Sequence, residues 1–203
     1  MTKISIPLIV ILSLAIALST ARGFPLGLDL AFADMSHQIV NAKLAFLIHI
    51  TVGSIALAIG SIQIIPAVRK NYLNVHRWLG RLYALAVLLG GASGFLIAFQ
   101  VDGIIGTSGF ALLAVFWLVV TVQAVRLARA HEVHAHRRWM ICSFALTFAA
   151  VTLRLQLAIF IFGLAMSYEQ VYPFLAWSCW VPNIVFSIWY AGRSQRENPT
   201  TVG

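Results

Sequence analysis

Long apolar stretches alternate with short polar connections along the whole chain. A helix needs about 20 consecutive apolar residues to cross a bilayer, because all its backbone amides must be bonded internally there. Stretches of this kind are Ile4–Ala21, Leu44–Ile65, Leu82–Val101, Gly103–Val125, Trp139–Tyr168 and Gln170–Gly192. The pattern predicts an all-α, polytopic membrane protein with six transmembrane helices. Pro182 removes one backbone hydrogen bond in the sixth helix and predicts a kink there.

The composition excludes most other classes of protein. Of the 203 residues, 61% are hydrophobic and 10% are charged, whereas a soluble domain is under half apolar and about a quarter charged. The net charge of +8 would suit nucleic-acid binding in a soluble protein. In an apolar chain, basic residues instead mark cytoplasmic loops, so we expect no nucleic-acid partner. Cys142 and Cys179 fall in apolar stretches and are expected to be free thiols.

The charged residues orient the predicted helices. If consecutive helices alternate in direction, eleven of the fourteen basic residues fall on one side: Lys3, Arg69, Lys70, Arg77, Arg81, Arg126, Arg129, Arg137, Arg138, Arg193 and Arg196. The acidic residues Asp29, Asp34, Asp102 and Glu169 fall on the other side. The positive-inside rule therefore predicts that both termini are cytoplasmic.

The chain divides into four predicted segments. Residues 1–22 are expected to be an N-terminal transmembrane anchor, although the same run suits a cleavable signal sequence. Residues 23–42 are expected to form an extracytoplasmic loop. Its first part is predicted to be irregular because of Gly23, Pro25 and Gly27. Residues 43–192 form the membrane domain, and residues 193–203 a cytoplasmic tail.

Polar residues recur at a spacing of 60 positions in the middle of the chain. Gln63 pairs with Gln123, Arg69 with Arg129, and His76-Arg77 with His136-Arg137. This predicts repeats over about 44–100 and 104–161, each with two helices. Two copies that cross in the same sense are related by an axis along the membrane normal. We expect a central four-helix bundle from a duplicated hairpin, with the first and sixth helices outside it.

Three predicted helices carry a polar stripe at helical spacing. The stripes are His49, Gly53, Ala56, Gly60 and Gln63; His76, Gly80, Tyr83, Val87, Gly90 and Gly94; and His136, Met140, Ser143, Thr147, Ala150 and Arg154. Ionisable groups are costly in hydrocarbon, so we expect the stripes to face the bundle interior. The small residues among them allow either close helix packing or a slot for a flat cofactor.

His76 and His136 begin two predicted helices at the same end of the bundle. Two neutral imidazoles that face one another can ligate a haem b iron axially, and Arg77, Arg137 or Arg138 can then meet its propionates. Gly80, one turn further along, leaves room for the ring. The alternative is that histidine and arginine at a span boundary are ordinary interfacial anchors.

His49 and Arg154 lie toward the opposite end of the bundle. His49 is roughly 28 Å from the first pair, by the helical rise, so it cannot share their ligand sphere. A satisfied interior histidine is one interpretation of it. Arg154 would cost at least about 2.5–3.5 kcal/mol inside a span unless something pairs with it. We expect His49, Gln63 and Arg154 to bind a ligand, such as an anionic or carbonyl-bearing molecule.

The segment His131-Glu132-Val133-His134-Ala135-His136 has several metal-ligating residue types. It lacks the two-residue gap of a zincin, and no second cluster supports it. We therefore interpret it as a solvated basic loop and predict no metal site.

Four segments of the chain resemble a bacterial membrane family, domain of unknown function 2306 (DUF2306). They are LIHITVGSIALAIGSIQ, HRWLGRLYALAVLLGG, HRRWMICSFALTFAAVTLRL and WVPN, within Lys43–Ala191. The resemblance implies a bacterial inner-membrane protein. It also implies characteristic polar positions at His49, Gln63, His76, Arg77, Gly80, Arg81, His136, Arg138, Met140 and Arg154. The sequence departs from the family at Ser187-Ile188-Trp189, where an acidic residue is expected.

The segment VHRWLG is more distantly similar to the haem-binding histidine motif of cytochrome b561-like proteins. That similarity implies at most one haem here, held by His76 and His136. The expected function is b-type haem electron transfer with a quinone or a small reductant. The alternatives are a cofactor-free carrier or small-molecule binder built around His49 and Arg154, or an accessory subunit of a membrane complex.

Overall fold

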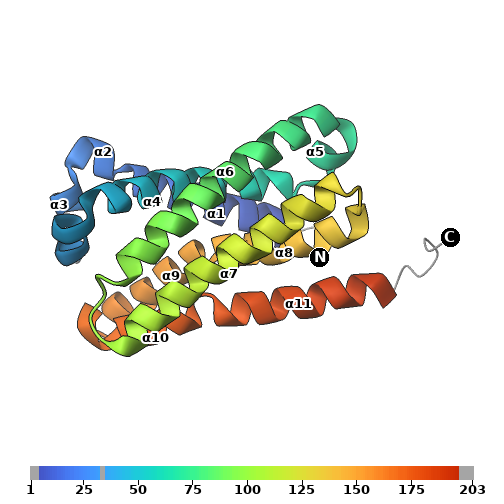
Figure 1. Cartoon of the computed structure of the whole chain (residues 1–203). Coiled ribbons are helices and arrows are strands. Elements are labelled where there is room, and N and C mark those ends of the chain that lie inside the picture. The colour runs from blue at the N-terminus through green and yellow to red at the C-terminus, as the bar shows by residue number, and fades with distance from the viewer. Residues whose placement is uncertain (1–4, 33–34, 197–203) are drawn as a thin grey trace.

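The computed structural model describes residues 5–32 and 35–196, and all the regular structure in these ranges is helical (Figure 1). The helices are α1 (Ser5–Ala21), α2 (Gly23–Leu26), α3 (Leu28–Ala31), α4 (Ser36–Gln63), α5 (Pro66–Asn71), α6 (Leu73–Ala98), α7 (Ile104–Arg129), α8 (Val133–Thr147), α9 (Ala149–Ala158), η2 (Ile159–Gly163), α10 (Tyr168–Ser178) and α11 (Val181–Arg196). Some residues used in the predictions lie outside the described residues. They are Lys3 and Asp34, which were used to orient the helices, and residues 197–203 of the predicted tail.

Within residues 5–32 and 35–196, five helical segments are long and apolar enough to cross a membrane. They are Ser36–Gln63, Leu73–Ala98, Ile104–Arg129, Val133–Gly163 and Tyr168–Arg193. The prediction of an all-helical membrane protein is thereby confirmed. Helix α1 is apolar but has only 17 residues, so the sixth predicted span stays a prediction.

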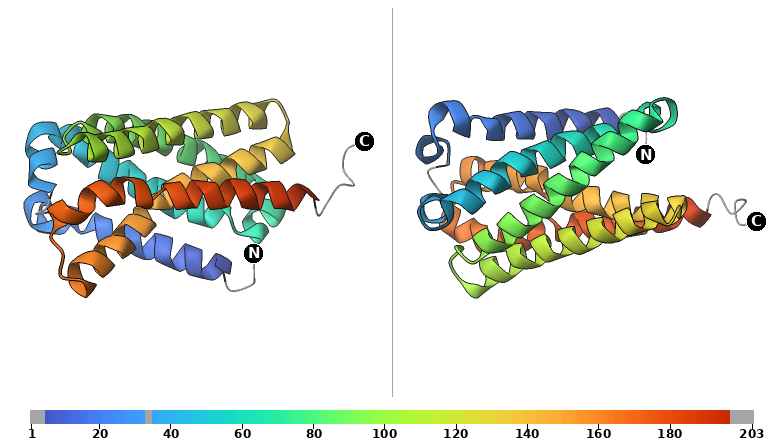
Figure 2. Two further views of the ribbon diagram at one scale, coloured as in Figure 1. Left: turned by 90° about the horizontal axis from the view of Figure 1, so that it is seen from below. Right: turned by 45° about the horizontal axis from the view of Figure 1, so that its top comes forward.

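Four helices pack in a ring at the centre of the molecule. Helix α4 packs against α6, α6 against α7, α7 against α8, and α8 back against α4. Helices α6 and α8 are therefore diagonal neighbours across the ring. Helix α1 covers α4 and α9, α10 covers α7 and α9, and α11 covers α8 (Figure 2). The duplication of the hairpin stays a prediction.

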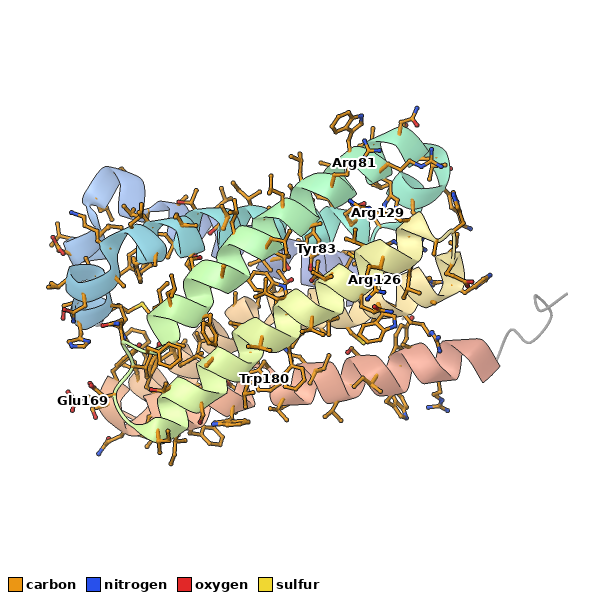
Figure 3. The ribbon with its side chains drawn as sticks, in the orientation of Figure 1. Arg81, Tyr83, Arg126, Arg129, Glu169 and Trp180 are labelled. Atoms are coloured by element: carbon orange, nitrogen blue, oxygen red, sulfur yellow. The ribbon has the colours of Figure 1, made fainter. Side chains whose placement is uncertain are left out.

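The molecule has two distinct ends, which Figure 1 shows at right and left. The α5 end holds α5, the α7–α8 connection, the start of α1 and the end of α11. The opposite end, which we call the α3 end, holds α2, α3 and the connections before α7 and α10. Arg81, Arg126 and Arg129 lie toward the α5 end, whereas Glu169 lies at the α3 end (Figure 3).

The segment predicted as an irregular loop is mostly helical. Gly23–Leu26 forms a helical turn that includes Pro25. Proline is tolerated there because the first N–H groups of a helix have no partner within it. Gly27, at φ +81°, then separates α2 from α3. Helix α4 starts at Ser36 and passes through a non-helical residue, Ala42. The prediction of an irregular start was therefore wrong for residues 23–26 and correct at Gly27.

The last two predicted spans are interrupted helices. The fifth breaks at Phe148 and ends in the π-helical turn η2, and neither feature has a local proline as its cause. The sixth breaks at Cys179–Trp180, just before Pro182. Pro182 lies in the first turn of α11, where its missing N–H has no partner to lose. The sixth predicted span is thus interrupted two residues before Pro182, and the predicted kink itself stays a prediction.

Candidate functional site

His136 lies at the start of α8 at the α5 end, and its ring has a defined orientation. Nδ1 lies 2.8 Å from the backbone oxygen of Ala124 on α7. A carbonyl oxygen only accepts, so Nδ1 donates the proton. In neutral imidazole this leaves the lone pair on Nε2, which is the arrangement found in metal-ligating histidines.

His76 lies at the start of α6, and its ring is not tied down in the same way. Its Nδ1 is buried without a hydrogen-bond partner. Gln63, at the end of α4, donates from Nε2 to the backbone oxygen of His76 at 2.9 Å, while its own Oε1 is also buried without a partner. Nδ1 of His76 and Oε1 of Gln63 are therefore two unsatisfied buried polar atoms on residues that contact each other. Such pairs are uncommon in folded proteins.

The two histidines stand on diagonally opposite helices of the ring, α6 and α8. They are close enough for their charges to interact. Gly80, one turn inward from His76, has no side chain, and a Cβ there would lie 3.2 Å from Nε2 of Gln63. The structure thus brings together His76, His136, Gln63 and Gly80 at one end of the ring, although the sequence predictions had grouped Gln63 with His49 and Arg154.

Arginines surround this end of the ring. Arg69 faces Arg137 and Tyr190: partial burial lowers the pKa of Arg69, the charge of Arg137 lowers it further, and Tyr190 opposes the change. Arg77 is exposed and lies within electrostatic range of His76, and Arg138 is also exposed. A cluster of this kind, with few acids nearby, favours an anionic group such as a carboxylate or phosphate.

A buried hydrogen-bond network closes the middle of the ring. The hydroxyl of Tyr83 on α6 lies 2.8 Å from Oγ of Ser143 and 2.7 Å from Oγ1 of Thr147 on α8. From α7, Nε1 of Trp117 donates to Oγ1 of Thr147 at 2.9 Å, and Oγ1 of Thr121 lies 2.6 Å from Oγ of Ser143. The network ties α6, α7 and α8 together at the centre of the molecule, where Figure 3 places Tyr83.

Sequence reasoning missed this network in part. Tyr83, Ser143 and Thr147 lay on the predicted stripes without an assigned role. Trp117 and Thr121 lay on the predicted helix without a polar stripe and were not singled out. Trp117 and Thr121 lie 26 and 22 residues before Ser143, and this spacing does not indicate a contact. Only the packing of α7 against α8 brings them to Thr147 and Ser143.

His49 is engaged between α4 and α6. Its Nδ1 donates to the backbone oxygen of Gly90 at 2.9 Å, and its ring fills the notch left by Gly94. Gly90 lies fourteen residues beyond His76 on the same helix, or about 21 Å along it. The predicted separation of His49 from the first pair is thus confirmed. None of the predicted site residues lines the shallow apolar groove beside Leu118, Val122 and Trp139 or the one beside Phe95, Leu96 and Val115.

Arg154 lies on α9, toward the α3 end, and has no carboxylate partner among the described residues. NH1 donates to the backbone oxygen of Ala150 and NH2 to Oγ1 of Thr20 on α1, both at 3.0 Å. The ionisable groups within electrostatic range are Arg22, Tyr172 and His49. The sequence could not indicate the contact with Thr20, because the two residues are 134 positions apart.

Comparison with known proteins gives one finding. A family model described as a predicted membrane protein (DUF2306) matches residues 46–190, well over half of the chain. The resemblance drawn from the sequence motifs is thereby confirmed. No curated protein and no solved structure gives a significant match.

Proposed function

Because the chain belongs to the DUF2306 family of predicted membrane proteins, whose description carries no activity, we propose a function from its own residues. One b-type haem would be held between His76 and His136 and would exchange electrons reversibly with a quinol or a small reductant. The observation that carries this proposal is the pair of imidazoles at the same end of two diagonally opposite helices. A b-type haem supplies reversible one-electron chemistry.

The donor set fits such a group. His136 has its Nδ1 fixed by Ala124, so Nε2 is the nitrogen with a free lone pair. His76 lacks the equivalent contact, but Oε1 of Gln63 is an unsatisfied acceptor on the adjacent residue. A bond from Nδ1 of His76 to this oxygen would orient the second ring in the same way and satisfy both buried atoms.

The surrounding residues suit the rest of the cofactor. Gly80, one turn beyond His76, allows the amide of Gln63 to lie 3.2 Å from where a Cβ would be, which places Gln63 beside His76. The guanidinium groups of Arg77 and Arg138, exposed at the same end, would meet the two propionates. Trp78 and Arg81, which stack with 4.9 Å between the guanidinium and the ring, mark the membrane boundary beside the site.

We also propose that the α5 end faces the cytoplasm of a bacterial inner membrane, with both termini on that side. This orientation is supported by the arginines gathered at the α5 end and by Asp29, Asp102 and Glu169 at the other. A reductant would then reach the haem from the cytoplasmic face.

The test is the reduced-minus-oxidised absorption spectrum of the detergent-purified full-length chain, expressed with ample haem supply. We expect about one haem per chain for a single bis-histidine site. His136→Ala and His76→Gly should each abolish the low-spin spectrum, and added imidazole should restore it in His76→Gly. His134→Ala is the matched control, because His134 is an exposed histidine of the same turn.

Two results would overturn the proposal. One is wild-type protein without pigment that elutes as a single folded species. The other is a haem spectrum that His76→Gly and His136→Ala both leave unchanged. Removal of the His76 ring breaks no hydrogen bond of Nδ1, and restoration of the spectrum by imidazole in His76→Gly would show that this variant is folded. A pigment-free protein would favour the cofactor-free binder.

A further inference from the structure

Arg154 is a membrane-embedded cation whose donors are only partly used. Its guanidinium has five N–H groups in a planar fork. One is directed to the backbone of its own helix and one to Thr20. The hydroxyl of Thr20 itself donates to the backbone oxygen of Ile16 at 2.9 Å, so it serves as a neutral acceptor and brings no negative charge. The positive charge of Arg154 is not compensated by these contacts.

The groups near Arg154 add positive charge and supply no negative charge. Arg22 lies within electrostatic range and adds a second positive charge, while its own NH2 donates to the backbone oxygen of Ala31. The other ionisable groups within electrostatic range of Arg154 are His49 and Tyr172. A buried imidazole or phenol is most stable in its neutral form, so neither supplies a negative charge. Arg154 lies within the candidate span Val133–Gly163, where an uncompensated arginine is costly and is typical of a ligand site.

The position of the pair indicates the kind of anion. Thr20 is one residue from the end of α1, so the fork of Arg154 lies level with the last turn of α1. Large apolar side chains are exposed on α1, on α9 and on η2, which continues α9: Leu18, Leu155, Ile159 and Phe162. A cationic pair at a helix end beside exposed apolar side chains matches the two parts of a phospholipid, a phosphate and its acyl chains.

We infer that Arg154 and Arg22 form a binding site for the phosphate of an anionic phospholipid, between α1 and α9 at the α3 end. Arg154 supplies a bidentate donor pair to the phosphate oxygens, and Thr20 keeps its fork in position. The acyl chains lie against the exposed apolar side chains of α1, α9 and η2. This inference is independent of the haem proposal, since the two sites are at opposite ends of the molecule.

Native mass spectrometry of the full chain, delipidated and then titrated with phosphatidylglycerol, tests the inference. We expect one tightly held lipid, and at least about a 10-fold weaker affinity in Arg154→Gln, because a charge-assisted bidentate pair is lost. Arg154→Lys should be intermediate, since it keeps the charge without the fork. Arg81→Gln is the matched control: it removes an arginine at the α5 end and should leave this lipid bound.

Thr20→Val provides a second variant if Arg154→Gln does not fold. It keeps the guanidinium but removes the oxygen that orients it, and we expect a several-fold weaker affinity. Equal phosphatidylglycerol binding by wild type and a folded Arg154→Gln, or by wild type and Thr20→Val, would overturn the site. If glycerol 3-phosphate displaces the lipid at comparable concentration, the site serves a soluble phosphate ester and the lipid assignment is wrong. If phosphatidylcholine binds as tightly, the site does not read headgroup charge and the inference also fails.

Discussion

The hydroxyl of Tyr83 provides a direct test of how the central network holds the helices together. Tyr83→Phe removes one oxygen atom and keeps the ring, which packs against Gly60 and is almost fully buried. The two hydrogen bonds that are lost join α6 to Ser143 and Thr147 on α8, at 2.8 and 2.7 Å.

The expected loss follows from the partners that remain. Hydrogen bonds between membrane helices contribute on average about 0.6 kcal/mol each, with values up to about 1.7. After Tyr83→Phe, Ser143 keeps its bond to Thr121 and Thr147 keeps its bond from Trp117. Neither partner is orphaned, so no large desolvation penalty is added. We therefore expect the free energy of unfolding to fall by about 1–2 kcal/mol.

The assay is reversible unfolding in mixed micelles of a mild and a denaturing detergent, followed by circular dichroism. Tyr72→Phe is the control, because Tyr72 is 62% exposed, and its free energy should change by less than about 0.5 kcal/mol. In a double-mutant cycle with Ser143→Ala, the two changes should be coupled by about 0.5–1 kcal/mol. A loss below about 0.3 kcal/mol, or additive effects in the cycle, would refute the view that this network stabilises the ring.

The glycines give two further predictions. Gly109→Ala should lower the free energy of unfolding by about 1–3 kcal/mol, because the added Cβ would lie 2.7 Å from the backbone oxygen of Ala176. Gly53→Ala should leave it unchanged or raise it by up to about 1 kcal/mol in the same assay, because no atom lies within 4 Å of the added Cβ. Gly94→Ala places a Cβ 2.9 Å from the His49 ring and should lower the midpoint of thermal unfolding by about 2–4 °C for each kcal/mol lost. Equal stability of the two alanine variants at positions 53 and 109, or an unchanged midpoint for Gly94→Ala, would contradict the packing described.

The apolar lengths in the sequence were sufficient to predict a helical membrane protein, because an isolated span must satisfy its own backbone within the bilayer. The ends of the helices were less accurate. Helix α6 starts at Leu73, three residues before His76, where the polar stripe predicted its start, and nine residues before the apolar stretch that begins at Leu82. Hydropathy detects the hydrocarbon-spanning part of a helix and not its full length.

The residues of the candidate sites were also visible in part. The spacing of His76 and His136 predicted that they lie at one end and His49 far from them, because helical rise fixes distance along an axis. The same spacing could not predict that Gln63 contacts the backbone of His76. This contact depends on how the chain turns through α5, which brings the end of α4 back to the start of α6.

What the sequence by itself determined is the class of protein, its five long apolar helices in the described residues and the inward face of the three that carry polar stripes, since these depend on periodicity and length along one chain segment. What only the tertiary structure decided is which helix lies across from which. The diagonal placement of α6 and α8, the bonds from Trp117 and Thr121 to α8, and the contact of Arg154 with Thr20 all follow from that arrangement. The physical reason is that the periodic pattern on one helix fixes only the direction in which a side chain points. The partner of that side chain depends on how the helices pack, because packing decides which second helix brings an atom within hydrogen-bond distance.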